Sequence, residues 1–209
     1  MTPPSVLTID DVPSRRFGDK LSLLVARGIP SVLFCWGEKI AGSEDLLVEA
    51  LGRGFILGNH SWTHRRFSTL AASEAREEVM ETEVALARIH AQAGVAWTTK
   101  YFRFPYLDRG TPGPQAQSLQ ELLRKAGYRG LVPGDGADSG CTFDQKEYHY
   151  GQAGSPEGLD QEEAILARIR PGFPAPGDRI LIHDHENTHE IFFRCIDGYR
   201  DLGLEFGLP

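Results

Sequence analysis

The chain has few cysteines and no long apolar run. Its three cysteines, Cys35, Cys141 and Cys195, are an odd number and include no C-x-x-C pair, which excludes a disulfide framework. No segment approaches the ~20 consecutive apolar residues of a membrane-spanning helix. The N-terminus has neither the basic start nor the apolar stretch of a signal peptide. We therefore expect no membrane span and a cytoplasmic protein as written, or an extracytoplasmic one if a leader has been removed.

The chain also has fewer basic than acidic residues. There are 22 Lys and Arg against 29 Asp and Glu, which gives a net charge of −7. This balance argues against a general nucleic-acid binder and against binding to an anionic membrane surface. The chain has no internal repeat and no low-complexity segment. At 209 residues it is expected to form one domain, residues 1–209.

Short apolar strands alternate with helices along the chain. Strands are expected at 6–9, 31–36, 55–58, 101–104, 128–132, 179–183 and 204–206, and helices at 15–28, 43–51, 73–90, 115–126, 159–170 and 188–202. Because the strands are apolar on both faces, the pattern predicts an α/β fold with a parallel sheet of about seven strands, open or closed into a barrel. The segment 133–156 is long for a connection and is expected to be a functional loop.

Polar residues that carry chemistry follow several of these strands. Asp10 and Asp11 follow the first, His60 follows the third, Arg103 lies in the fourth, and His183 ends the strand at 179–183. In a parallel α/β fold, chemistry gathers at the carboxyl ends of the strands. We therefore expect these residues to converge on one rim.

The acid pair and the segment 60–64, an H-x-x-x-H, together predict a metal site. Histidines four residues apart lie on one face if the segment is a turn of helix, so that His60 and His64 can share a metal. Asp11 is the natural third ligand, and Asp10 is then left to act as a base on a water whose pKa the metal lowers. A divalent metal is expected, zinc first, with cobalt, nickel or manganese as alternatives. Exposed helix histidines are the alternative interpretation of this segment.

Two further features leave alternatives open. Arg103 lies inside an apolar strand and is either a surface arginine on an edge strand or a buried cation paired with Asp10. The segment 185–189 matches the H-E-x-x-H pattern of zinc peptidases, which must lie within a helix. Here it follows a strand closely, and residues 187–188 look like a helix start. We therefore expect His183 to be a general acid or a substrate ligand, and the histidines of 185–189 to be polar rim residues.

These motifs resemble those of a known family. Residues 8–13, T-I-D-D-V-P, are similar to the T-F-D-D-G-P motif of the NodB-homology polysaccharide deacetylases, carbohydrate esterase family 4. Residues 60–64 resemble the H-[ST]-x-x-H motif of that family, 103–106 its R-x-P-[YF], and 180–183 its L-x-H. The motifs occur in family order over nearly the whole chain.

The resemblance implies a distorted (β/α) barrel and the metal-dependent removal of an N-acetyl group from an amino sugar. Carried over by matching position, Asp10 would be the base. Asp11, His60 and His64 would bind the metal, and Arg103 would orient Asp10.

The resemblance also implies residues for substrate binding and proton donation. Pro105, Tyr106 and Leu181 would bind the substrate. The backbone around Tyr106 would help to hold the oxyanion, and Leu181 would line the pocket for the acetate methyl group. His183 would protonate the leaving amine.

The chain departs from the family pattern at three places. Val12 replaces the usual glycine after the acid pair, and Arg65 replaces a common proline. The family's fourth motif, an aspartate followed by tryptophan that supports the catalytic histidine, has no clean match. Asp135, Asp138 and Asp144 lie in the right region, and Asp144 is the one that we expect to support His183.

Three functions remain in competition. The first is a deacetylase of N-acetylated carbohydrates. Val12 and the unclear fourth motif motivate a second, a non-catalytic carbohydrate- or metal-binding module. A deacylase of small N-acyl compounds is a variant of the first. A zinc peptidase that uses residues 185–189 is the third.

Overall fold

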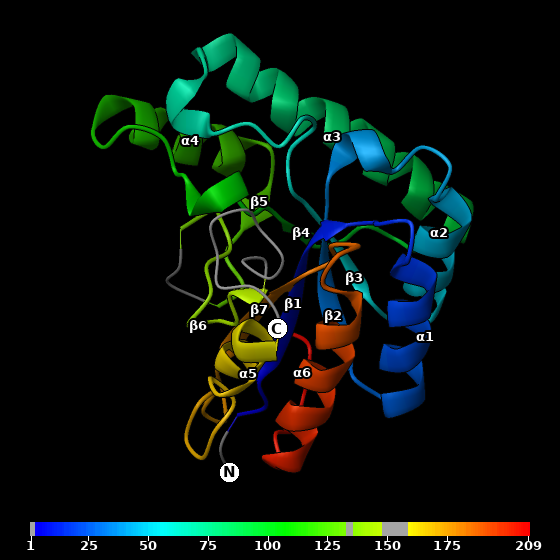
Figure 1. Cartoon of the computed structure of the whole chain (residues 1–209). Coiled ribbons are helices and arrows are strands. Elements are labelled where there is room, and N and C mark those ends of the chain that lie inside the picture. The colour runs from blue at the N-terminus through cyan, green and yellow to red at the C-terminus, as the bar shows by residue number, and fades with distance from the viewer. Residues whose placement is uncertain (1–2, 133–135, 148–158) are drawn as a thin grey trace. The chain divides into compact units, whose positions relative to one another are not determined.

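The computed structural model describes residues 3–132, 136–147 and 159–209 (Figure 1). By its internal contacts the chain divides into two compact units. The first unit comprises residues 1–32 and 141–208, and the second comprises 33–140 together with Pro209. This division does not test the expectation of one catalytic domain, which stays a prediction.

Parallel strand pairing organises the first unit. Its elements are β1 (Val6–Val12), α1 (Phe17–Arg27), β6 (Phe143–Asp144), α5 (Leu159–Leu166), β7 (Arg179–His183) and α6 (His189–Asp201). Both β1 and β6 pair with β7 in parallel. All seven residues of β1 are buried, as expected of a strand that is apolar on both faces. Helices α1 and α6 pack together in this unit (Figure 1).

The register of β1 against β7 fixes where the acid pair lies. Leu7 is opposite Ile180, and Asp10 is opposite His183. Side chains on paired residues of adjacent strands lie on the same face of a sheet. The carboxylate that follows the apolar run of β1 is therefore a direct neighbour of the histidine that ends β7.

The second unit is built around an aromatic core. Its regular elements are α2 (Glu44–Gly52), β3 (Ile56–Asn59), α3 (Ala72–Ala93), β4 (Lys100–Tyr101), α4 (Pro114–Lys125) and β5 (Tyr128–Arg129), while β2 (Ser31–Cys35) crosses the boundary with the first unit. Strands β4 and β5 pair in parallel. The rings of Phe67, Phe102 and Phe104 meet edge to face, with centroids 4.9 to 5.8 Å apart. This core packs helices α3 and α4 onto the segment that carries Arg103.

The structure confirms the predicted fold class, an α/β fold with parallel strands. The described residues form seven strands, β1 to β7, but not all at the predicted places. The predicted strand at 204–206 is wrong, since only Phe206 makes a single bridge, to Ser5. The short β6 forms inside the segment that was expected to be a loop. Two residues with no apolar run around them carry no strand signal, so the sequence could not reveal β6.

Among the described residues, no helix is both long enough and apolar enough to cross a membrane.

Candidate active site

The H-x-x-x-H segment after β3 is not helical, so the predicted helical turn is wrong. Ser61 and His64 have φ angles of 66° and 59°, values in the left-handed region that an α-helix does not contain. The segment nevertheless brings the two histidines together, with ring centroids 4.9 Å apart. The prediction that the rings of His60 and His64 lie close together is confirmed, although the segment between them does not have the predicted helical conformation.

A buried acid of α3 takes over the hydrogen bonds that a helix would have supplied. The carboxylate of Glu78 accepts from the backbone N–H groups of Trp62 (2.9 Å) and Thr63 (2.8 Å) and from the Thr63 hydroxyl. The side chain of Asn59 accepts from the N–H of Ser61 at 2.9 Å and donates to a carbonyl of α3. The loop between the histidines is thereby fixed from one side by Glu78 and from the other by Asn59.

The environment of His60 and His64 suits a metal. The Nδ1 atom of His60 lies 2.8 Å from the carbonyl oxygen of Arg103. A carbonyl only accepts, so Nδ1 carries the proton, and the lone pair of Nε2 is left to coordinate. The ring of His64 stacks on Trp36 (4.4 Å between centroids) and meets Tyr106 at 4.8 Å, which limits how the imidazole can turn.

Arg103 is completely buried, so the alternative of a surface arginine on an edge strand is wrong. Its Nε donates to the carbonyl of Ser139 at 3.0 Å and its Nη2 to that of Gly140 at 3.3 Å. The guanidinium lies 4.2 Å from the centre of the Phe34 ring, a cation–π contact. The predicted pairing with Asp10, which belongs to the other unit, stays a prediction.

In the first unit, the acid that holds His183 is Glu147, which is not among the predicted site residues. The Oε1 atom of Glu147 lies 2.8 Å from Nδ1 of His183 and also accepts from the backbone N–H of His183 at 2.5 Å. The side chain of Glu147 has no exposed surface. A sequence signal existed, because Glu147 directly precedes Tyr148 and an acid before an aromatic residue is the pattern of the family's fourth motif.

Two of the three aspartates predicted as candidates to support His183 have hydrogen bonds that the structure describes. Asp138 bonds to the Nε of Arg109 at 2.8 Å and to Gln120, and Asp135 falls outside the described residues. Asp144 accepts from the backbone N–H of Lys146 at 2.9 Å. Burial raises the pKa of Asp144, although that bond and the charge of His183 act in the opposite direction. A catalytic part for Asp144 stays a prediction.

The proton affinity of His183 follows from its surroundings. Burial by itself would lower the pKa of the imidazole. The charge and hydrogen bond of Glu147, joined by the charges of Asp10 and Asp11, outweigh burial and raise the pKa to about 9. His183 is therefore protonated at neutral pH, the state that a general acid requires.

The residues expected to bind substrate are placed on two elements. Pro105 and Tyr106 lie in a short 3₁₀ turn, Pro105–Leu107, directly after the aromatic core. Tyr106 has a φ of 58° and its side chain is largely exposed. Leu181 is buried in the middle of β7. Their roles in substrate binding stay predictions.

The zinc-peptidase interpretation of residues 185–189 is wrong. Helix α6 begins at His189, so His185 lies outside the helix that this motif needs. The two histidines also have different partners. His189 lies 3.7 Å from the carboxylate of Asp19, whereas Nε2 of His185 contacts Oδ2 of Asp11. The expectation that His185 is a simple rim residue missed this contact.

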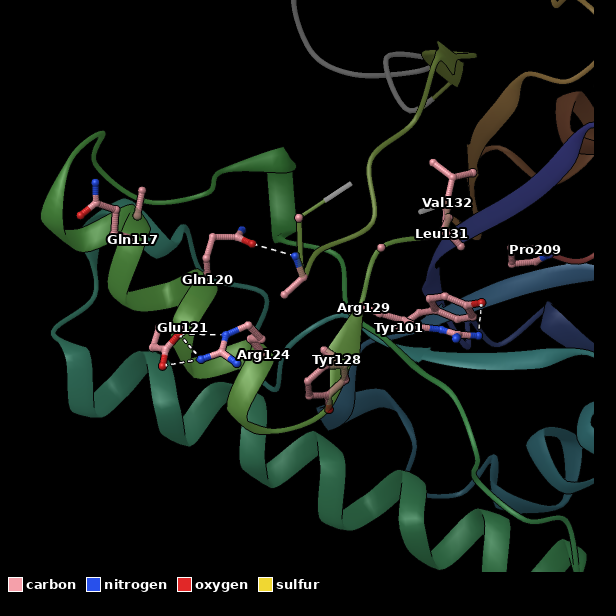
Figure 2. A pocket seen from close by; sticks show the side chains of 14 residues that line it. Tyr101, Gln117, Gln120, Glu121, Arg124, Tyr128, Arg129, Leu131, Val132 and Pro209 are labelled. Atoms are coloured by element: carbon pink, nitrogen blue, oxygen red, sulfur yellow. Dashed lines mark hydrogen bonds and ion pairs between the residues drawn. The ribbon is translucent and has the colours of Figure 1, made fainter. Parts of the chain in front are cut away.

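The second unit also contains a cavity of about 970 Å³ beside α4 and β5 (Figure 2). Several of its polar lining groups bond to one another. Gln120 accepts from the N–H of Ala137 at 2.8 Å, and Glu121 pairs with Arg124 at 2.7 Å. None of the predicted site residues lines this cavity, so it is not a candidate for the active site.

Comparison with known proteins agrees with the motifs. The sequence profile described as polysaccharide deacetylase matches residues 2–131, which is more than half of the chain. The chain belongs to the polysaccharide deacetylase family. A chitooligosaccharide deacetylase from Rhizobium leguminosarum bv. trifolii is 26% identical over 200 residues, which cover 95% of this chain and 79% of that protein.

Solved structures of the family share the fold. A family 4 carbohydrate esterase from Streptomyces lividans, in complex with acetate, matches with a TM-score of 0.70 and 25% identity over 100% of this chain and 94% of that one. A CE4 family pseudoenzyme from Bacillus anthracis matches with a TM-score of 0.71 at 18% identity, over 99% of this chain and 63% of that one. The chain thus has the NodB-type α/β fold that its motifs predicted, and it spans less than two thirds of the pseudoenzyme's length.

The bonds of Glu78 predict a measurable contribution to stability. Glu78→Gln removes the negative charge and replaces one of the two oxygens that together accept three hydrogen bonds from the 60–64 loop. We expect the free energy of unfolding to fall by about 1.5–3 kcal/mol, as for other hydrogen bonds to charged groups. Urea denaturation measures the change. Glu77→Gln on the exposed side of the same helix serves as the control and should change the free energy by less than about 0.5 kcal/mol. Equal effects of the two substitutions would contradict the conclusion that Glu78 stabilises the 60–64 loop.

The contact between Glu147 and His183 predicts a shifted titration. In the metal-free protein, Glu147→Gln removes the negative charge but leaves the burial. The titration midpoint of His183, followed by NMR of the imidazole, should therefore fall from about 9 toward the ordinary 6.5 or lower. The exposed Glu163→Gln should leave it in place. An unchanged midpoint in Glu147→Gln would contradict the assignment.

The same shift fixes a pH dependence of stability. Since the folded-state pKa lies above 6.5, protonated His183 contributes stability that is fully present below pH 6.5 and is lost as the pH rises through about 9. The stability difference between the unaltered protein and Glu147→Gln should therefore be larger at pH 6 than at pH 10.

Proposed function

We propose that this chain is a metal-dependent hydrolase that removes N-acetyl groups from amino sugars in a polysaccharide or oligosaccharide. The observation that carries the proposal is the arrangement at the end of β1 and β7. The imidazole of His183 contacts the buried carboxylate of Glu147, which favours its protonated form, and lies opposite Asp10 in the strand register. A proton donor and a carboxylate base as neighbours are what amide hydrolysis requires.

The donor set fits a divalent metal. We propose that Asp11, His60 and His64 hold it, zinc first, with cobalt, nickel or manganese as alternatives. Two imidazoles and one carboxylate leave coordination positions open for water and substrate. When bound, the metal would lower the pKa of a water and polarise the acetyl carbonyl.

The protein's own residues would then move the protons. Asp10 takes a proton from the water as its oxygen attacks the acetyl carbon, and Arg103 stabilises the charge of Asp10. A backbone N–H near Tyr106 donates to the oxyanion. As the carbon–nitrogen bond breaks, His183 gives its proton to the departing amine, and acetate is left as the second product. Leu181 would contact the acetate methyl group.

The substrate class rests on the relatives. The chitooligosaccharide deacetylase of Rhizobium leguminosarum bv. trifolii aligns with nearly the whole chain, which favours an N-acetylated amino sugar over a peptide. A small N-acyl compound is an alternative substrate with the same reacting bond.

Asp10→Asn tests the base. The amide has nearly the shape of the carboxylate but cannot accept the proton, so acetate release should fall by about 10²- to 10⁴-fold. Zinc binding, measured by competition with a chromophoric chelator, should persist because Asp10 is not a proposed ligand. Full activity of Asp10→Asn would eliminate Asp10 as the base.

A non-catalytic carbohydrate- or metal-binding module is the second candidate. Val12, which stands where the family has glycine, is fully buried in β1 and is the departure that motivates it. The zinc- or cobalt-loaded protein is incubated with an acetylated chitooligosaccharide, and the released acetate is measured. The deacetylase proposal expects turnover. Zinc binding without acetate release from oligosaccharides or small N-acyl compounds would favour the module instead.

A further inference from the structure

The two residues that follow β7 are fixed by a buried ion pair. Nζ of Lys20 lies 2.7 Å from Oδ1 of Asp184, and both side chains are inaccessible to solvent. Ser14 donates to the same carboxylate twice, from its hydroxyl to Oδ1 (2.8 Å) and from its backbone N–H to Oδ2 (2.6 Å). The carboxylate thus has three donors, which offset the cost of burying its charge.

The main chain of this segment is tied on both sides. The N–H of Asp184 donates to the carbonyl of Asp10 at 2.8 Å. The carbonyl of the next residue, His185, accepts from Nζ of Lys20 at 2.9 Å. Asp184 is therefore tied to β1 and His185 to α1, so the backbone of His185 has little freedom to move.

From this fixed position the ring of His185 meets the acid pair. Its Nε2 contacts Oδ2 of Asp11, whose side chain is buried, while the ring of His185 is partly exposed. A carboxylate oxygen only accepts, so the proton of this bond lies on Nε2 of His185. His183 contacts a different acid, Glu147, through its Nδ1 atom.

We propose that His185 is a positioning residue for Asp11, with Lys20 and Asp184 as its support. This inference rests on the proposed function, in which Asp11 is a metal ligand. By engaging one oxygen of Asp11, His185 fixes the rotation of the carboxylate and directs the other oxygen to the metal. Partners of this kind behind a ligating carboxylate commonly raise metal affinity.

The position of Asp11 explains why such a partner is needed. Asp10 and Asp11 are adjacent like charges, and Asp11 has a φ of 65°, so its carboxylate direction is not set by regular strand geometry. The contact of His185 with Asp11 gives the two adjacent acids different surroundings. It holds Asp11 for the metal, while Asp10 is the proposed base.

Zinc affinity of the metal-free protein, titrated against a chromophoric chelator, tests the proposal without reference to turnover. His185→Leu removes the donor and should weaken zinc binding by about 10- to 100-fold. His185→Gln should retain most of the affinity, because its amide nitrogen can occupy the place of Nε2. Glu186→Gln, at an exposed neighbour that pairs with Arg15, is the matched control and should bind zinc as the unaltered protein does. Equal thermal unfolding midpoints of the metal-free variants would show that the fold is intact.

Two results would overturn the proposal. Unchanged zinc affinity in His185→Leu would show that the contact does not matter. A loss in His185→Gln as large as that in His60→Ala would make His185 a direct ligand. Two further variants, His60→Ala and Asp11→Asn, test the proposed metal site itself. If neither changes the zinc affinity, zinc does not bind at this site, and the proposed function fails independently of the role of His185.

Discussion

Parallel pairing of β1 with β7 is the constraint on which the chemistry of the first unit depends. The register sets Asp10 opposite His183. The neighbouring residues of each strand supply the other polar side chains of this region. Asp11 follows Asp10 within β1 and Ser14 comes after the strand, while Asp184 and His185 come directly after β7. A slip of β1 by one residue would turn the side chains of that strand, Asp10 among them, to the other face of the sheet. The continuous apolar runs of both strands are therefore also what keeps the acids and the histidines together.

Buried charges in this protein come with partners that the fold supplies from distant parts of the sequence. Lys20 meets Asp184, Glu147 meets His183, and Arg103 lies between two carbonyls and an aromatic ring. An unpaired charge at any of these depths would be unfavourable by several kcal/mol. The polar groups of the candidate site thus also help to specify the native arrangement.

Much of this could be predicted because apolar runs and motif residues are local signals. The strand predicted at 179–183 is confirmed, the strand predicted at 6–9 extends to Val12 and so includes the acid pair, and the four short motifs indicate the family. What failed depends on contacts distant in sequence. The loop 60–64 is shaped by Glu78 of a later helix, and His185 is placed by Lys20, 165 residues away. Glu147 lies in a segment without periodicity, where its one sequence signal is that it directly precedes Tyr148.

The single oxygen of Glu147 that bonds twice to His183 has a chemical consequence. It accepts from the backbone N–H and from Nδ1 of the same residue, so Nδ1–H is retained whether the imidazole is charged or neutral. The tautomer of the neutral ring is thereby fixed, and Nε2 is the ring nitrogen that would exchange a proton in the proposed reaction. The leaving amine would have to approach His183 along the direction of Nε2, and this direction is set by main-chain geometry as much as by the imidazole itself.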